Sequence, residues 1–301
     1  MDYIKHLYRD TTIGHWLFNS IKKLKDFINS RILPEKLYRK RIFKNIYGYN
    51  LDLENPKTIQ EKINWLQLND RTQLHTLCTD KYAVREYVKE KIGEQYLIPL
   101  VLHSTNPKDI VSENLPDYPF IIKTNHGSRG HVIVRDKSKI DWKSVQKNLK
   151  KSLKSNFYYN AREWQYKNIK PRIIVEKLLL DKNNNIPYDY KFICYNGHVA
   201  FIEVIIDRHT DIKSNFYDSD WKIVKYEGFF KSGNDFKRPV NFSKMKSTAE
   251  ILAKDFRFLR VDLYDIESKI YFGEMTFSPV AGFEPFPPLE LVKKLGINLE
   301  L

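Results

Sequence analysis

Two strand patterns near the C-terminus each carry one acid among large apolar residues. Residues 258–264 (FLRVDLY) and 269–277 (KIYFGEMTF) have the character of β-strands, and a polar bend around residues 265–268 joins them. A hairpin folded back near Ser268 would place Asp262 almost opposite Glu274, with Arg260 on the same face as Asp262. Facing acids destabilise a sheet, and unpaired charge is costly among apolar side chains. The pattern therefore predicts a cation between the two acids.

Two different cations could fill this position. Mg²⁺ prefers oxygen ligands, so Asp262 and Glu274 are candidate ligands of a metal that also holds phosphate oxygens. The guanidinium of Arg260 could instead bridge one or both acids in a structural role. A slip of one residue in the register would separate the two acids altogether. The sequence leaves these alternatives open.

A second candidate segment spans residues 120–134, where two apolar strands flank a loop that contains Gly127 and Gly130. Glycine permits conformations that direct several backbone N–H groups at one point, and anions bind such loops. Lys123 ends the first strand, where its ammonium could neutralise phosphate oxygens as a point charge. A plain hairpin turn would show the same glycines.

Two further segments carry charged residues within strand patterns. Residues 189–202 predict a hairpin with Asn196-Gly197 as its turn, and Asp189 and Lys191 share one face of its first strand. Lys191 could be a second phosphate-binding cation or a partner in a salt bridge. In residues 171–181, Glu176-Lys177 interrupt apolar residues, so the backbone there could face the edge of an adenine, although an exposed edge strand would look the same.

The remaining patterns mix helices and strands. Residues 12–70 predict amphipathic helices, one of which begins with a capping box at Thr58 and Glu61, and further helical patterns occupy residues 80–92, 141–154 and 243–254. Strand patterns lie between them at residues 96–101, 119–124, 131–135, 172–180 and 198–206, with hairpins in place of strict βαβ alternation. This arrangement predicts an α+β fold. At 301 residues and 42% hydrophobic content, the chain can bury a large core.

The bulk composition narrows the partners and the compartment. A formal net charge of +14 predicts attraction to an anion, such as a nucleotide, a phospholipid surface or an acidic polysaccharide. Two isolated cysteines exclude a disulfide framework, and neither a signal peptide nor a membrane span is evident, so a cytoplasmic protein is expected. The basic helix pattern around residues 12–28 would allow peripheral contact with a membrane, although a helix packed on its own domain shows the same pattern.

The order and spacing of these segments resemble those of the ATP-grasp superfamily. Their amino-acid sequences resemble those of its TupA-like branch, which is named for teichuronopeptide synthesis. The resemblance implies two α+β lobes around a nucleotide cleft, in a catalytic region of residues 75–301 that follows an N-terminal helical region of residues 1–74. The smaller, nucleotide-binding lobe would span about residues 117–180. The matching stretches are residues 80–99, 122–128, 171–176, 189–192, 260–264 and 272–277.

The resemblance also implies roles for individual residues and the cofactors ATP and Mg²⁺. Asp262, Glu274 and Thr276 would bind magnesium, while Arg260 and Lys191 would be catalytic. Thr276 is a departure, because many members carry Asn there, and Arg129 adds bulk and charge to the glycine loop. The implied nucleotide-binding residues are Lys123, His126, Gly127, Ser128, Gly130, Glu176, Lys177, Leu178, Leu179, Asp189 and Lys191.

The resemblance implies a carboxylate–amine ligase that forms an amide through an acyl phosphate. The expected substrates are an amine or amino acid and a sugar carboxylate, such as a uronic acid of a surface polysaccharide. One alternative is an ATP-dependent sugar kinase that uses the same nucleotide site. A glycosyltransferase and a non-catalytic protein that binds glycans or nucleic acid are further alternatives. No nucleic-acid partner is expected, because the sequence contains no recognisable nucleic-acid-binding motif.

Overall fold

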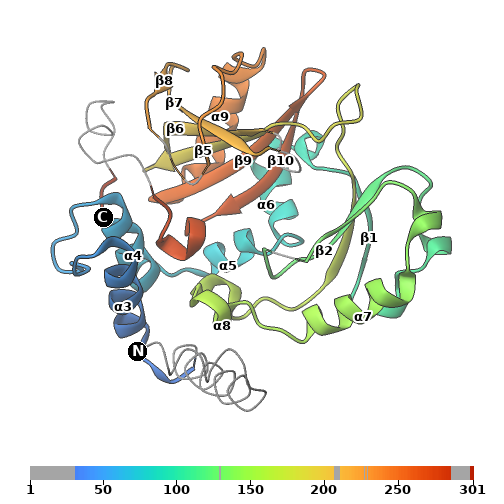
Figure 1. The fold of residues 1–301 in the computed structure, drawn as a ribbon, viewed down its shortest axis with the longest axis horizontal. Helices are drawn as coiled ribbons and strands as arrows, with labels where there is room; N and C mark the ends of the chain where they lie inside the picture. Colours follow the sequence, from blue (N-terminus) through green and yellow to red (C-terminus); the bar gives the residue numbers. More distant parts are fainter. Residues whose placement is uncertain (1–30, 129, 207–210, 227, 229, 286–298) are drawn as a thin grey trace, which may run out of the picture.

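The computed structural model describes residues 31–128, 130–206, 211–226, 228, 230–285 and 299–301. The helix predicted around residues 12–28 and Arg129 of the glycine loop lie outside the described residues. Two antiparallel sheets, with helices packed on them, form two lobes (Figure 1). The prediction of an α+β fold with two lobes after an N-terminal helical segment is confirmed.

The smaller sheet has the strand order β1-β4-β2-β3. Its strands are β1 (Leu100–Ser104), β4 (Ile173–Lys177), β2 (Phe120–Thr124) and β3 (Val132–Val134). Helix α7 (Trp142–Leu153) covers one face, where its Val145 and Leu149 pack in a core with Ile122 and Val175. Because successive strand residues alternate between faces, Ile121 and Lys123 point to the other face. That open face forms one wall of a cavity.

The larger sheet has the strand order β10-β9-β5-β6-β7-β8. Its apolar face packs under helices α6 (Val84–Ile92) and α9 (Phe242–Ala253), which bury Val88, Met245 and Leu252 completely. The other face is charged at one end and apolar at the other. The strands are β5 (Asp189–Tyr195), β6 (His198–Ile206), β7 (Lys213–Asp218), β8 (Ile223–Val224), β9 (Phe258–Ile266) and β10 (Lys269–Thr276).

The N-terminal helices α3 (Glu35–Tyr47) and α4 (Ile59–Asn69) are joined to the larger lobe. Helix α4 begins at the predicted capping box, and its Ile59 and Ile63 pack against the apolar end of the larger sheet. Arg39 of α3 is fully buried, and its guanidinium donates to the carbonyl oxygens of Arg162 and Ala281. These two helices therefore pack directly against the rest of the described chain.

Short elements complete the described fold. Helices α5 (Gln73–Thr79) and α8 (Tyr158–Ala161) lie between the lobes in Figure 1. None of the helices in the described part of the chain is long and apolar enough to cross a bilayer. The 3-10 turns are Glu94–Tyr96, Pro107–Asp109, Ser112–Asn114, Lys137–Lys139, Trp164–Tyr166 and Pro279–Gly282.

A β-bulge at Gly273 sets the register of the last hairpin. The turn lies at Glu267 and Ser268, and Lys269 pairs with Ile266, a register that if continued would place Glu274 opposite Val261. The register instead shifts between Phe272 and Glu274, so Glu274 pairs with Asp262. The extra residue is a glycine because a Cβ there would lie 2.9 Å from the Asp262 carbonyl oxygen.

We predict that Gly273→Ala lowers the free energy of unfolding by about 1–3 kcal/mol, because the new methyl group overlaps backbone and the Tyr264 ring. Urea denaturation measures this change. Gly127→Ala is the matched control, since a Cβ there meets Phe157 at an ordinary 3.7 Å. Equal stability of the two variants would contradict the close packing assigned to the bulge.

Candidate functional site

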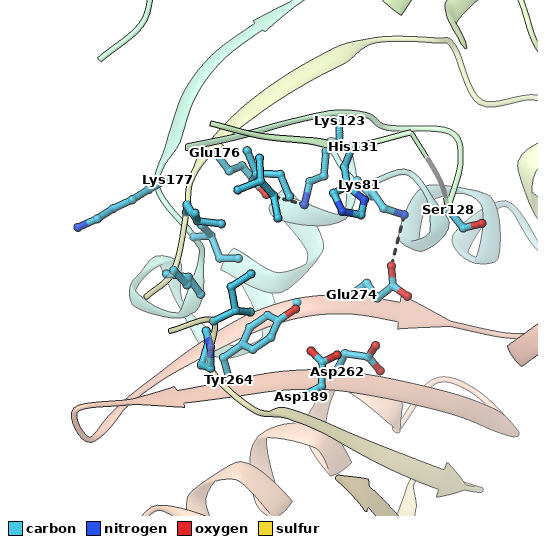
Figure 2. A pocket seen from close by; sticks show the side chains of 18 of the residues that line it. Lys81, Lys123, Ser128, His131, Glu176, Lys177, Asp189, Asp262, Tyr264 and Glu274 are labelled. Carbon is cyan, nitrogen blue, oxygen red and sulfur yellow. Dashed lines mark ion pairs between the residues drawn. The ribbon is translucent and has the colours of Figure 1, made fainter. Parts of the chain in front are cut away.

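A cavity of about 330 Å³ lies between the two sheets. Figure 2 shows Lys81 and Lys123 on its upper side and Asp262 and Glu274 on the larger sheet below. The apolar part of its lining is made by Ile98, Ile121, Ile133, Leu178, Leu179, Ile186 and Pro187. The polar and remaining lining residues are Lys81, Lys123, Thr124, Gly127, Ser128, His131, Glu176, Lys177, Asp189, Arg260, Asp262, Tyr264, Gly273 and Glu274.

The cavity brings together most of the residues singled out from the sequence. His126, Gly130, Lys191 and Thr276 are not among the described residues that line it. The predicted residues that do line it are Lys123, Gly127, Ser128, Glu176, Lys177, Leu178, Leu179, Asp189, Arg260, Asp262 and Glu274.

Arg260 bridges the two acids on the floor of the cavity. Its Nε and Nη2 donate to the two carboxylate oxygens of Asp262 at 2.7 and 2.8 Å, and Nη2 also donates to Glu274 Oε1 at 3.0 Å. The Nζ of Lys81 lies 3.4 Å from Glu274 Oε2. Burial raises the pKa of Asp262, whereas Lys81 and Arg260 outweigh burial at Glu274 and lower its pKa. The structural role considered for Arg260 is thus present in the protein.

The same acids also suit a magnesium ion bound with a nucleotide. Asp262 and Glu274 offer carboxylate oxygens on one sheet face, and Mg²⁺ commonly takes one or two carboxylates, with phosphate oxygens and water completing its coordination. Within the described ranges, no group of three or more acid, histidine or cysteine side chains is placed to hold a metal by itself. Thr276 Oγ1 donates to Glu274 Oε1 at 3.0 Å, so it orients this carboxylate; its role as a ligand stays a prediction.

Glu176 holds Lys123 in place on the opposite wall. Glu176 is 4% exposed, and its carboxylate accepts from Arg85 Nη1 at 3.1 Å. The Nζ of Lys123 lies 2.6 Å from the other carboxylate oxygen, an ion pair that lacks hydrogen-bond alignment. Beyond Glu176, the N–H groups of Lys177 and Leu178 donate to Pro99 O and Pro119 O. An adenine contact in this segment would therefore use its carbonyl groups or the N–H of Leu179.

The glycine loop contacts the C-terminal end of α7. Gly127 and Ser128 line the cavity, whereas the buried ring of His126 has its Nε2 at 3.2 Å from both Ser152 O and Ser155 O. The imidazole lies within hydrogen-bond distance of two carbonyl oxygens at the end of the helix, and Ser152 O also accepts from the N–H of Ser155. Burial lowers the pKa of His126. The side chain of His126 thus connects the loop to α7.

Lys191 lies on the larger sheet beside Asp262, but its ammonium is paired elsewhere. Its strand neighbours are Asp262 on β9 and Glu203 on β6, and its Nζ lies 2.9 Å from Glu203 Oε2. Both side chains of this ion pair are buried. Contact between Lys191 and a phosphate stays a prediction, and it would require the ammonium to leave Glu203.

Sequence reasoning missed Lys81, Arg85 and His131 as site residues. The backbone N–H of Lys81 donates to Asn125 O at 3.1 Å, and the side chain of Asn125 donates to Asp80 at 2.8 Å. These bonds fix Lys81 beside the glycine loop. The segment Asp80-Lys81-Tyr82 is one of the stretches that match the ATP-grasp family, and this match was the only signal for Lys81. No local sequence pattern distinguishes Lys81 from the other lysines of the chain.

A sequence profile described as TupA-like ATPgrasp matches residues 61–300. The chain belongs to this family. A search of curated protein sequences gave no match. In this TupA-like protein, the matched segment contains both sheets and every residue that lines the cavity.

Solved ligase structures resemble the chain at low identity. A D-alanine–D-alanine ligase from Bacillus anthracis is 16% identical, with a TM-score of 0.39, over 67% of this chain and 57% of that chain. An L-amino acid ligase from Bacillus licheniformis is 12% identical, with a TM-score of 0.41, over 83% and 56%. The ATP-grasp ligase PsnB, complexed with minimal precursor, Mg and ADP, is 11% identical, with a TM-score of 0.37, over 73% and 58%. The chain thus spans little more than half the length of each.

We predict that Lys81→Ala weakens the binding of Mg·ADP by about 10- to 100-fold, because a charge-assisted contact to phosphate contributes roughly 1.5–3 kcal/mol. Titration calorimetry measures the affinity. Lys89→Ala is the matched control, since Lys89 also pairs with a glutamate, Glu94, but lies outside the cavity. An equal loss in both variants would contradict a role for Lys81 in the site.

The buried acid Glu163 contacts Ser278, which follows the end of β10. Ser278 Oγ donates to Glu163 Oε1 at 2.7 Å and accepts from Gln165 Nε2 at 2.9 Å. Burial raises the pKa of Glu163 from 4.5 to about 7. Between these two values the folded state binds more protons than the unfolded chain, so the contribution of Glu163 to the free energy of unfolding falls as the pH rises.

We predict that Glu163→Gln stabilises the protein at pH 8 by up to about 3 kcal/mol and has little effect at pH 4.5, because the amide keeps an acceptor for Ser278 without a buried charge. Urea denaturation at both pH values measures the difference. The prediction fails if wild type and variant show the same pH dependence.

Proposed function

We propose that this chain is an ATP- and Mg²⁺-dependent carboxylate–amine ligase. The proposal rests on one observation, that acidic and basic side chains face each other across the cavity. Asp262 and Glu274 lie on the larger sheet, and Lys81 and Lys123 approach from the other side (Figure 2). Paired carboxylates suit a divalent ion, and lysines suit the phosphates that such an ion bridges. Membership of the TupA-like ATP-grasp family supports the same assignment.

The cavity offers each part of a nucleotide a matching environment. The isoleucines and leucines of the lining suit the flat faces of adenine, and the backbone of residues 177–179 suits its polar edge. Lys81, Lys123 and the Gly127-Ser128 backbone would bind the phosphates. Asp262 and Glu274 would hold Mg²⁺, which supplies positive charge next to the transferred phosphoryl group.

In the proposed reaction, an oxygen of the substrate carboxylate attacks the γ-phosphorus of ATP. The bond to the bridging oxygen breaks, ADP leaves, and an acyl phosphate forms. The nitrogen of the amine then attacks the acyl carbon, phosphate departs, and the amine loses a proton. Arg260 and Lys123 act by position and charge alone, which matches a reaction whose main demand is to neutralise developing negative charge.

We propose a uronic acid of a surface polysaccharide as the carboxylate, and an amino acid or another amine as its partner. Two features support an acidic glycan: the resemblance to the TupA-like branch, which is named for teichuronopeptide synthesis, and the net charge of +14. A cytoplasmic enzyme at the inner face of the membrane fits this role. Helix α3 supports peripheral contact, because it exposes Leu37 on the same side as Lys40 and Lys44.

We predict that Asp262→Asn and Glu274→Gln each lower ADP release by at least about 100-fold while the fold is retained, because the metal loses a charged ligand. A coupled assay for ADP, in a screen of amino acids against uronic-acid glycans with Mg²⁺, measures the effect. Asp218→Asn is the control, since its carboxylate accepts from the backbone of a turn outside the cavity. Full activity of either cavity variant would refute the metal assignment.

Hydroxylamine distinguishes the ligase from a kinase that uses the same nucleotide site. An acyl phosphate reacts with hydroxylamine to give a hydroxamate, which is detected by its iron complex. We expect ATP-dependent hydroxamate from the wild type with the carboxylate substrate. ADP release with a phosphorylated sugar and no hydroxamate would identify a kinase instead.

A further inference from the structure

Five lysines form one exposed face of the small lobe. Lys143, Lys147, Lys150 and Lys151 of α7 and Lys154 at its C-terminal cap are all exposed, and the helix contains no acid. We call these five residues the lysine face of α7. At 1.5 Å per residue the helix is about 18 Å long, so the lysine face is a linear array of positive charge.

No acid in the described part of the chain forms an ion pair with the lysine face, unlike the two lysines just before α7. Nearby Lys137 and Lys139 pair with Asp117 and Asp136, whereas none of the lysine-face residues has an ion pair in the described ranges. Lys143 and Lys147 lie one turn apart, as do Lys147 and Lys151, and like charges at this spacing destabilise a helix. A bound anion would remove that repulsion.

The packing of α7 fixes the lysine face outward. Val145 and Leu149 on its opposite side are buried in the core of the small lobe, so the helix cannot turn. The exposed residues within α7 are its four lysines, Ser144 and Asn148, without an apolar side chain that could enter a bilayer. This distinguishes α7 from α3, which exposes Leu37 and Ile46. The lysine face therefore suits a hydrophilic polyanion.

Helix α7 packs on the face of the small sheet opposite the cavity, but its C-terminal end contacts the glycine loop. The ring of His126 contacts the carbonyl oxygens of Ser152 and Ser155 at the C-terminal end of α7. A Cβ added to Gly130 would lie 3.9 Å from Ser152 Oγ. His126 is followed directly by Gly127 and Ser128, which line the cavity. In Figure 1 the end of α7 points toward α8 and the larger lobe. A chain laid along α7 would thus arrive at the glycine loop.

We propose that the lysine face of α7 binds a linear polymer of carboxylates and guides it to the cleft, so that the carboxylate substrate is one unit of a polyanionic chain. This inference rests on the proposed function, which places carboxylate activation in the adjacent cavity. The lysines bind as point charges without the planar fork of arginine, which suits evenly spaced anionic groups of varying orientation. Binding by this array needs no nucleotide.

The test compares two triple variants that remove equal charge. Lys143→Gln/Lys147→Gln/Lys151→Gln alters the lysine face, and Lys36→Gln/Lys40→Gln/Lys44→Gln alters the same spacing on α3. Glutamine has a helix propensity close to that of lysine, so both variants should fold, as circular dichroism would verify. The probe is fluorescein-labelled oligogalacturonate, and anisotropy measures its binding without ATP.

We expect the wild type to bind the oligomer more tightly than monomeric galacturonate, with an affinity that falls as salt is added. The α7 variant should bind at least about tenfold more weakly, and the α3 variant within about twofold of the wild type. Equal losses in the two variants would overturn the proposal, because net charge alone would explain them. Unchanged binding by the α7 variant would overturn it as well.

Two further probes separate the partner class and the proposed reaction. The first probes are single-stranded DNA of matched charge and vesicles containing phosphatidylglycerol. Tighter binding of either probe than of the oligomer, through the same lysines, would overturn the assignment to a carboxylate polymer. Mg·ADP affinity should be equal in all three proteins, because the lysine face lies outside the cavity. Oligomer binding through α7 without ATP-dependent hydroxamate would refute the proposed ligase while leaving the polymer-binding face in place.

Discussion

The cavity depends on one charged cluster, in which Arg260 is held between Asp262 and Glu274. Two facing carboxylates on a mostly buried sheet would repel each other strongly at the low effective dielectric of a protein. The guanidinium contacts both, so the two acids stay together on one face of the sheet. The bulge at Gly273 is what makes this cluster possible, because it brings Glu274 opposite Asp262. The geometry of this cluster is therefore a consequence of strand register.

The second wall of the cavity is organised around Glu176. This acid accepts from Arg85 and pairs with Lys123, so the charge of Lys123 is balanced and its position is fixed. Lys81 connects the two walls, since its backbone bonds to the glycine segment and its ammonium pairs with Glu274. Positive and negative side chains thus alternate across the cleft. A nucleotide bound with its metal would replace these internal ion pairs. The lysines would then contact phosphate and the acids would contact the metal, so each side chain would keep a partner of opposite charge.

The sequence predicted the hairpins well where turn chemistry was explicit and less well where it was not. Asn196-Gly197 gave the correct two-residue turn, with Tyr195 opposite His198. The last hairpin was placed around Ser268, whereas the turn occupies Glu267 and Ser268 and Lys269 pairs with Ile266. The prediction that Asp262 lies opposite Glu274 was nevertheless correct. The turn as observed would pair Glu274 with Val261, and the bulge shifts this register by one residue, to Asp262. A period of two cannot reveal such a bulge.

By itself, the sequence determined the α+β architecture, the strands that carry Lys123, Asp262 and Glu274, and the capping box at Thr58, because these depend on local periodicity and local hydrogen bonding. Only the tertiary structure decided which charges meet. It paired Lys191 with Glu203, placed Arg260 between two acids and brought Lys81 to Glu274. Ion pairs between residues far apart in the chain depend on register and on the packing of the lobes, and no local pattern encodes either.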